Sequence, residues 1–208
     1  MSATVTPLDF QPQKAPEDEA RAGYYALLAR LFYGGPDARL LETIGGSGEP
    51  VAEAEPTPLA MAWNALASAA RAADAEAARL EYDQLYVGTG KAPVTPYASF
   101  YLTESGREKI LVRIRQELDA MGLAKSDSAR EPEDHVSGLF EIMRHLISKG
   151  SDDAALQKQR DFFERYLERS LPPFCNAICV NEKADFYRHV ARFAQAFFVV
   201  ETEALKVF

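Results

Sequence analysis

The stretch EPEDHVSGLFEIMRH, residues 131–145, gathers side chains that could carry acid–base or metal chemistry. It holds four acidic residues and two of the 3 histidines of the chain. Carboxylates and imidazoles act as general acids and bases, and both bind divalent metals. Glu131 with His135, and Glu141 with His145, are four residues apart, so each pair would share one face of a helix. The segment could therefore form a catalytic site, a metal site or only the start of a helix.

Helix formation alone would explain part of this pattern. Proline suits the first position of a helix, and acidic side chains are stabilised near its N-terminal end. We therefore expect Pro132 at the first helical position and Glu131 at the cap. Glu133 and Asp134 would then lie in the first turn. His135 lies on the edge of an apolar stripe, so we expect it to be half buried. The residues of that stripe are Val136, Leu139, Phe140, Met143 and Ile147.

An enzyme is the alternative interpretation of the same residues. A carboxylate can orient an imidazole, so a metal-dependent or acid–base hydrolase is chemically feasible. Its groups would be Glu131, Asp134, His135 and Glu141. Against a metal site, His145 is rotated well away from His135 on a helix, and dinuclear carboxylate helices use a Glu-x-x-His spacing. Against a hydrolase, no serine or cysteine stands in a nucleophile-elbow motif. A helical interaction module is a third interpretation.

The composition narrows the class of protein. A chain of 208 residues, 47% of them hydrophobic, can bury a full core in one domain. The formal net charge of -8 would repel a nucleic-acid backbone, so no nucleic-acid partner is expected. No apolar run reaches the length of a membrane span, and the N-terminal stretch does not look like a secretory signal. We therefore expect a cytoplasmic protein without stable membrane insertion.

The elements that must position these residues are predicted to be helices. Residues 1–15 are aperiodic and are expected to form a flexible arm, with an all-helical domain over residues 16–208. Pro16, Thr57 with Pro58, and Asp74 are helix-start signals. Residues 87–101 carry two glycines, two prolines and no helical period, which predicts a long loop. Since no stretch alternates as a strand would, we predict an all-α, single-domain bundle of roughly eight to ten helices.

Three sequence blocks together resemble the TorD/DmsD family of redox-enzyme maturation chaperones, to which NarJ-type chaperones are more distantly similar. The first block is EYDQLYVGTGKAPVTPYASFYL, which resembles the family's Leu-aromatic helix end followed by a Pro-aromatic-x-Ser-x-aromatic loop. The second is EPEDH followed by an apolar helix. The third, LPPFCNAICVNEKADFYRHVARFAQAFF, is similar in layout to the last two helices of the family. Together the blocks extend the resemblance over about residues 20–205.

The resemblance implies a function that is not enzymatic. Such proteins bind the twin-arginine signal peptide and the apo form of a molybdopterin-containing oxidoreductase, and they support cofactor insertion and proofreading before export. No cofactor and no metal of the chaperone itself are implied, and the protein would be a monomer or a homodimer, with or without helix exchange. By position, the resemblance implies peptide-binding roles for Tyr82, Leu85, Tyr86, Pro96, Tyr97, Ser99, Tyr101, Asp134 and His135. A carboxylate can bind guanidinium, so Glu131 is a further candidate for contact with the arginines.

Overall fold

The structure, a computed structural model, describes residues 15–47, 55–87, 92–124 and 130–207. Over these ranges the chain forms ten α-helices and two short π-helical segments, and no strand. The predicted all-α bundle of eight to ten helices is confirmed. The predicted N-terminal arm lies outside the described residues except for Ala15. None of the helices in the described ranges is both long and apolar enough to cross a membrane.

The helices are α1 Pro16–Tyr33, α2 Ala38–Gly46, α3 Pro58–Ala72, α4 Ala75–Tyr82, α5 Ala98–Leu102, α6 Arg107–Ala120, α7 Val136–Ser148, α8 Asp153–Phe162, α9 Leu171–Cys179 and α10 Phe186–Lys206. The π-helical segments η1 Asp83–Val87 and η2 Phe163–Leu167 continue α4 and α8 without a break. Such segments widen a helix by one residue per turn and often occur at functional sites.

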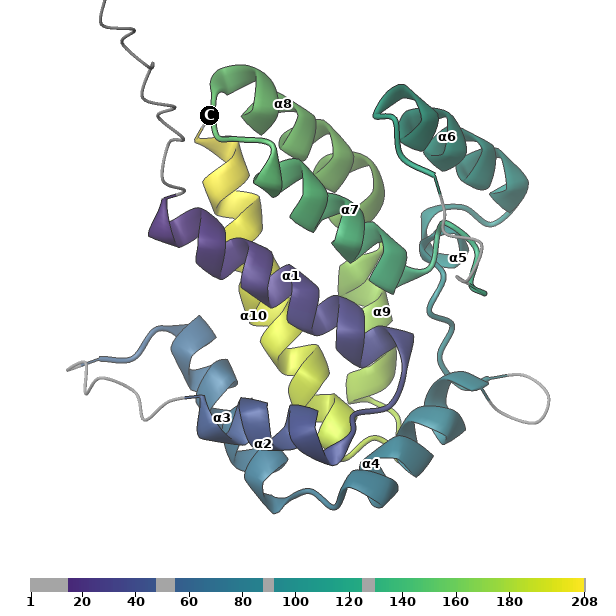
Figure 1. The fold of residues 1–208 in the computed structure, drawn as a ribbon. Coiled ribbons are helices and arrows are strands. Elements are labelled where there is room, and N and C mark those ends of the chain that lie inside the picture. The colour runs from purple at the N-terminus through teal and green to yellow at the C-terminus, as the bar shows by residue number, and fades with distance from the viewer. Residues whose placement is uncertain (1–14, 48–54, 88–91, 125–129, 208) are drawn as a thin grey trace, which may run out of the picture.

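The core forms where α1, α7 and α10 cross. In Figure 1, α1 lies beside α7 with α10 behind it, and α2 with α3 covers one end of the bundle. Tyr25 and Phe140 have no exposed surface, and the ring of Tyr25 packs against those of Phe140 and Phe197. A buried ion pair fastens the same helices, because Arg21 of α1 donates to the fully buried Glu201 of α10 at 2.6 Å.

The predicted helix starts hold in the first half of the chain. α1 begins at Pro16, and the side chain of Thr57 caps α3 by accepting a hydrogen bond from the N–H of Ala60 at 3.2 Å. Asp74 caps α4 in the same way, with a bond of 2.9 Å from the N–H of Ala77. The predicted loop over residues 87–101 is partly wrong, because α5 starts at Ala98, and residues 88–91 of that loop lie outside the described ranges.

The helix of the acidic segment begins later than predicted. Its first residue is Val136, and the cap is His135, whose Nδ1 accepts a hydrogen bond from the N–H of Ser137 at 3.3 Å. Residues 132–135 form a turn, closed by the N–H of His135 donating to the carbonyl of Pro132 at 3.1 Å. The placement of Pro132 at the first helical position, of Glu131 at its cap and of the next two acids in its first turn was therefore wrong.

A long-range main-chain contact explains the late start. Two hydrogen bonds of 2.9 Å join residues 134–136 to residues 96–98, on either side of a bridge between Tyr97 and His135. Their donors are the N–H groups of Ala98 and Val136, and their acceptors are the carbonyls of Asp134 and Pro96. This pairing holds the backbone of His135 extended, with φ −62° and ψ 133°, so the helix starts only after it.

Candidate functional site

The turn over residues 131–135, called here the acidic turn, supplies the centre of the candidate site. Tyr97 packs the edge of its ring against His135, with ring centroids 5.5 Å apart and planes at 77°. Its hydroxyl donates to Glu131 Oε2 at 2.8 Å. Burial and this hydrogen bond to a carboxylate raise the pKa of Tyr97 to about 12, so the hydroxyl keeps its proton at neutral pH. The structure thus brings Tyr97, Glu131 and His135 together.

His135 is more buried than predicted. Its exposed fraction is 2%, whereas a half-buried ring was expected. Burial lowers the pKa of His135 from 6.5 to about 4, although the nearby charge of Glu131 opposes this shift. The imidazole is therefore neutral at neutral pH. The apolar stripe predicted after it is confirmed, since all five of its residues are buried.

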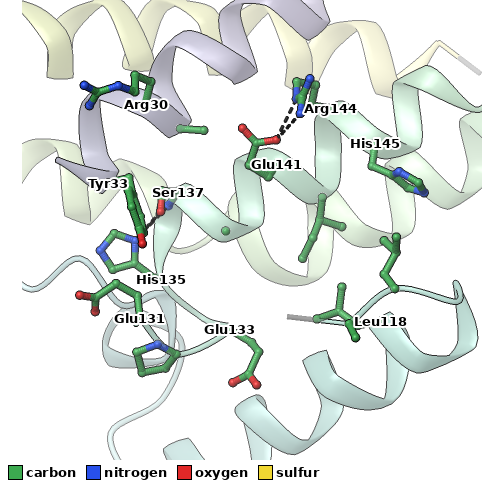
Figure 2. A pocket seen from close by; sticks show the side chains of 16 residues that line it. Arg30, Tyr33, Leu118, Glu131, Glu133, His135, Ser137, Glu141, Arg144 and His145 are labelled. Atoms are coloured by element: carbon green, nitrogen blue, oxygen red, sulfur yellow. Dashed lines mark hydrogen bonds and ion pairs between the residues drawn. The ribbon is translucent and has the colours of Figure 1, made fainter. Parts of the chain in front are cut away.

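A groove opens beside the acidic turn. It has a volume of about 570 Å³ and lies between α1, the end of α6, the acidic turn and α7. Figure 2 shows Tyr33 and Arg30 of α1 on one side, Glu131 and His135 below them, and Glu141 further along α7. Apolar parts of the lining are contributed by Ala29, Leu118, Leu123, Pro132 and Ile142. The groove therefore combines an apolar surface with polar and charged groups.

The charges of the groove are mostly paired. Glu133 forms an ion pair with Arg115, with Nε to Oε1 at 2.9 Å, and Glu141 forms one with Arg144 at 2.7 Å. Glu131 accepts a hydrogen bond from the Tyr97 hydroxyl. Among the described residues that line the groove are three carboxylates and two guanidinium groups.

Asp134 lies apart from this lining although its neighbours on both sides belong to it. It is 3% exposed, and its carbonyl accepts one of the two hydrogen bonds of the bridge. The negative charge of its carboxylate contributes to the raised pKa values of Tyr97 and Arg115, which places it near both. The role visible for Asp134 is to hold the acidic turn against residues 96–98 through its main-chain carbonyl.

A second group of predicted residues forms what we call the aromatic cluster, which consists of Tyr82, Leu85, Tyr86 and Tyr101 with Phe174 and Tyr187. Leu85 is fully buried and Tyr86 is 8% exposed, both on η1. The ring of Tyr86 lies 5.0 Å from that of Tyr82 and 5.4 Å from that of Tyr187. Tyr101 reaches the cluster from α5, with its ring 6.1 Å from that of Phe174.

The hydroxyl groups of the aromatic cluster differ in their partners. Tyr82 donates to the carbonyl of Phe32 at 3.3 Å, and Tyr101 donates to that of Thr95 at 2.9 Å. The hydroxyl of Tyr86 is buried and has no hydrogen-bond partner within the described residues. Burial, followed by the charge of Glu131, raises the pKa of Tyr82 to about 12, so the cluster and the acidic turn are neighbours.

The remaining two predicted residues, Pro96 and Ser99, lie outside the groove lining. Pro96 and Ser99 are buried, and Pro96 supplies its carbonyl to the bridge with the acidic turn. Of the ten predicted peptide-binding residues, only Glu131 and His135 line the groove. The prediction missed Arg30 and Tyr33 of α1 and Ser137 of α7. No sequence signal points to the first two, because only the packing of α1 on α7 brings them there.

The groups proposed for an enzyme do not converge. Glu141 is ion-paired along its own helix, and Asp134 is absent from the lining that holds Glu131 and His135. Within the described ranges, no group of three or more histidine, cysteine, aspartate or glutamate side chains could hold a metal ion. Glu81 accepts hydrogen bonds of 2.8 to 3.0 Å from three N–H groups at the start of α10.

Comparison with known proteins gives one family and a set of relatives. The family model described as nitrate reductase delta subunit matches residues 52–176, a range that includes all ten predicted site residues. The chain is 26% identical to the chaperone protein TorD of Shewanella loihica, over 92% of this chain and 96% of that protein. It is also 26% identical to the chaperone protein TorD of Vibrio parahaemolyticus, over 56% of this chain and 59% of that protein.

A solved structure shares the fold. The crystal structure of a proposed redox enzyme maturation protein from Archaeoglobus fulgidus superposes with a TM-score of 0.52. The alignment covers 91% of this chain and 95% of that one, at 21% sequence identity. At this identity the likeness concerns the fold alone.

Proposed function

The chain belongs to the nitrate reductase delta subunit family, and from this premise we propose that it is a non-enzymatic chaperone of redox-enzyme maturation. Its client would be the apo form of a molybdopterin-containing oxidoreductase, recognised in the cytoplasm through a twin-arginine signal peptide. Binding would support cofactor insertion and delay export until the client is complete. The TorD relatives are chaperones by name, and the resemblance of the sequence blocks to the same family supports the more specific part of the proposal.

The groove beside the acidic turn is the observation that carries this proposal. A twin-arginine peptide presents two guanidinium groups followed by an apolar segment. A receptor for it needs a carboxylate next to an apolar surface, because guanidinium groups bind carboxylates strongly and apolar side chains gain from burial. Glu131 lies at one end of a groove whose walls include Leu118, Leu123 and Ile142. We assign the first contact with an arginine to Glu131.

Titration calorimetry with synthetic twin-arginine signal peptides tests the proposal. The full chain is expected to bind at least one such peptide, and the same peptide with two lysines should bind more weakly, because lysine cannot form the bidentate contact. Absence of binding to every peptide of a broad panel, by a protein shown to be folded, would contradict the proposed function.

Two matched variants test whether Glu131 contacts an arginine of the peptide. Glu131→Gln should weaken binding about tenfold, since it removes a charge-assisted hydrogen bond. Glu164→Gln removes an equal charge from an exposed residue of η2 that is outside the groove lining. It should leave the affinity unchanged. Equal effects of the two variants would indicate that only the net charge of the protein attracts the peptide.

A further inference from the structure

The hydrogen bonds of His135 determine which of its ring nitrogens carries the proton. Nδ1 lies 3.3 Å from the main-chain nitrogen of Ser137, which can only donate. Nδ1 therefore accepts, and cannot itself hold a proton. The Ser137 hydroxyl lies 2.7 Å from the same nitrogen, so it too donates to Nδ1. Because burial keeps the ring neutral, its single proton must be on Nε2.

The protonated nitrogen keeps a donor that no described residue uses. No described residue forms a hydrogen bond with Nε2, and this atom is not among the fully buried polar atoms that lack a partner. The ring lines the groove although the residue is only 2% exposed. In Figure 2, Ser137 lies on one side of the ring and Glu131 on the other.

The ring is also held rigidly. The two 2.9 Å main-chain bonds flank His135, and the ring of Tyr97 packs against it at 5.5 Å. Its own backbone carbonyl accepts the first hydrogen bond of α7, from the N–H of Leu139 at 3.2 Å. A donor fixed in this way loses little conformational entropy when it binds a ligand.

The surroundings of Nε2 define the acceptor that fits it. An anionic acceptor would be repelled by the carboxylate of Glu131, whose charge acts on His135. A guanidinium or ammonium group cannot accept a hydrogen bond at all. The remaining acceptor in a peptide with arginines and apolar side chains is a neutral oxygen, and every residue of a peptide offers one in its main chain.

We propose that Ser137 fixes His135 as the Nε2–H tautomer, and that this N–H donates to a main-chain carbonyl oxygen of the client segment in the groove. The proposal rests on the function proposed above and adds the chemistry of recognition. His135 would bind the main chain of the client, whereas Glu131 would bind an arginine side chain. Ser137 is a positioning residue, because it acts on the ligand only through the imidazole.

Two substitutions of His135 separate its two nitrogens. A glutamine amide nitrogen lies close to the position of Nε2 and retains the donor, whereas an asparagine side chain ends near Nδ1. Asparagine is also a good helix cap, so His135→Asn retains the cap of α7 and loses the donor. His135→Gln retains the donor and weakens the cap. Thermal stability and peptide affinity should therefore rank the two variants in opposite orders.

The experiment combines nitrogen NMR with calorimetry on the full chain. In the free wild-type protein, the imidazole of His135 should show a protonated Nε2 and an unprotonated Nδ1. The probe for binding is a twin-arginine signal peptide that the wild-type chain binds. His135→Gln should bind it within about threefold of wild type, and His135→Asn about tenfold more weakly.

Three outcomes overturn the inference. They are a protonated Nδ1 in the free protein, equal affinities of the two variants, or tighter binding by His135→Asn than by His135→Gln. If the wild-type chain binds no twin-arginine peptide, the function proposed above fails, and the nitrogen shifts still decide the tautomer. The failure of the proposed function and the failure of the tautomer assignment are thus distinguishable.

Discussion

The aromatic cluster and the groove differ in what their side chains are available to do. Leu85 and Tyr86 of the cluster are buried among other rings and contribute to the core. Glu131 and Tyr33 at the groove keep surface that a ligand can reach. Both regions contain residues of the blocks that resemble one family, and the groove has a volume of about 570 Å³. Part of the motif therefore packs in the core and part of it lines the groove.

The two regions meet where Tyr82 lies near Tyr97 and Glu131. Tyr97 is half buried and holds Glu131 with its hydroxyl, while the loop that carries it leads from η1 to α5. A change in the buried part of the aromatic cluster should lower the stability of the fold. A change at the groove should lower affinity at nearly constant stability. The predictions below test this division, from the largest expected effect to the smallest.

Leu85→Ala should destabilise the fold by about 3 kcal/mol, because it removes a fully buried side chain and leaves a cavity. Urea denaturation measures this change. Leu80→Ala is the matched control, because Leu80 is 45% exposed, and it should change stability by less than about 0.5 kcal/mol. Equal losses in the free energy of unfolding of the two variants would mean that Leu85 does not contribute to the core.

Acid should destabilise the fold through His135. The folded-state pKa is about 4 and the ordinary value is 6.5, so the unfolded chain binds the proton first as the pH falls. This contribution to stability is fully present above about pH 6.5 and is lost as the pH falls towards about 4. The loss should amount to about 2 to 3 kcal/mol.

The comparison for this effect is His135→Asn, which retains a cap and has no ionisable ring. Urea denaturation at several pH values should give a smaller acid destabilisation in the variant than in wild type. Titration of the carboxylates contributes to both proteins and cancels in the difference. The same pH dependence in both would contradict the burial of a neutral imidazole.

Tyr86→Phe and Tyr97→Phe should have opposite effects. The first removes a buried hydroxyl that has no partner in the described part of the chain, so stability should stay equal or rise by about 1 kcal/mol. The second removes the hydrogen bond to Glu131 and should cost about 1 kcal/mol and lower peptide affinity. A loss of peptide affinity with Tyr86→Phe would show instead that the ligand reaches into the cluster.

Local signals predicted the fold well. Pro16, Thr57 and Asp74 start helices as expected, because a cap or a proline acts within one turn of the chain. The start of α7 was misplaced, because it depends on main-chain pairing with residues 96–98, which no local pattern encodes. The cap of α10 by Glu81 comes from more than a hundred residues away and was missed for the same reason.

Two of the residues singled out from the sequence, Glu131 and His135, line the groove, and their contact with a peptide stays a prediction. The expectation for Asp134 did not foresee its burial, since an acid two residues after a proline gives no sign of main-chain pairing. Tyr33 stands about a hundred residues before the acidic turn and joins it only because α1 packs on α7. Long-range packing, rather than residue type, decides which motif residues line the groove.

Site-specific photo-crosslinking tests the central claim, that the client peptide binds in the groove, most directly. A benzoylphenylalanine in place of Tyr33, which lines the groove and is 48% exposed, should crosslink to a bound twin-arginine peptide. The same group in place of Val180, which follows α9 and is 70% exposed, should not. A peptide that binds both proteins but crosslinks equally from the two positions, or only from position 180, would contradict the account.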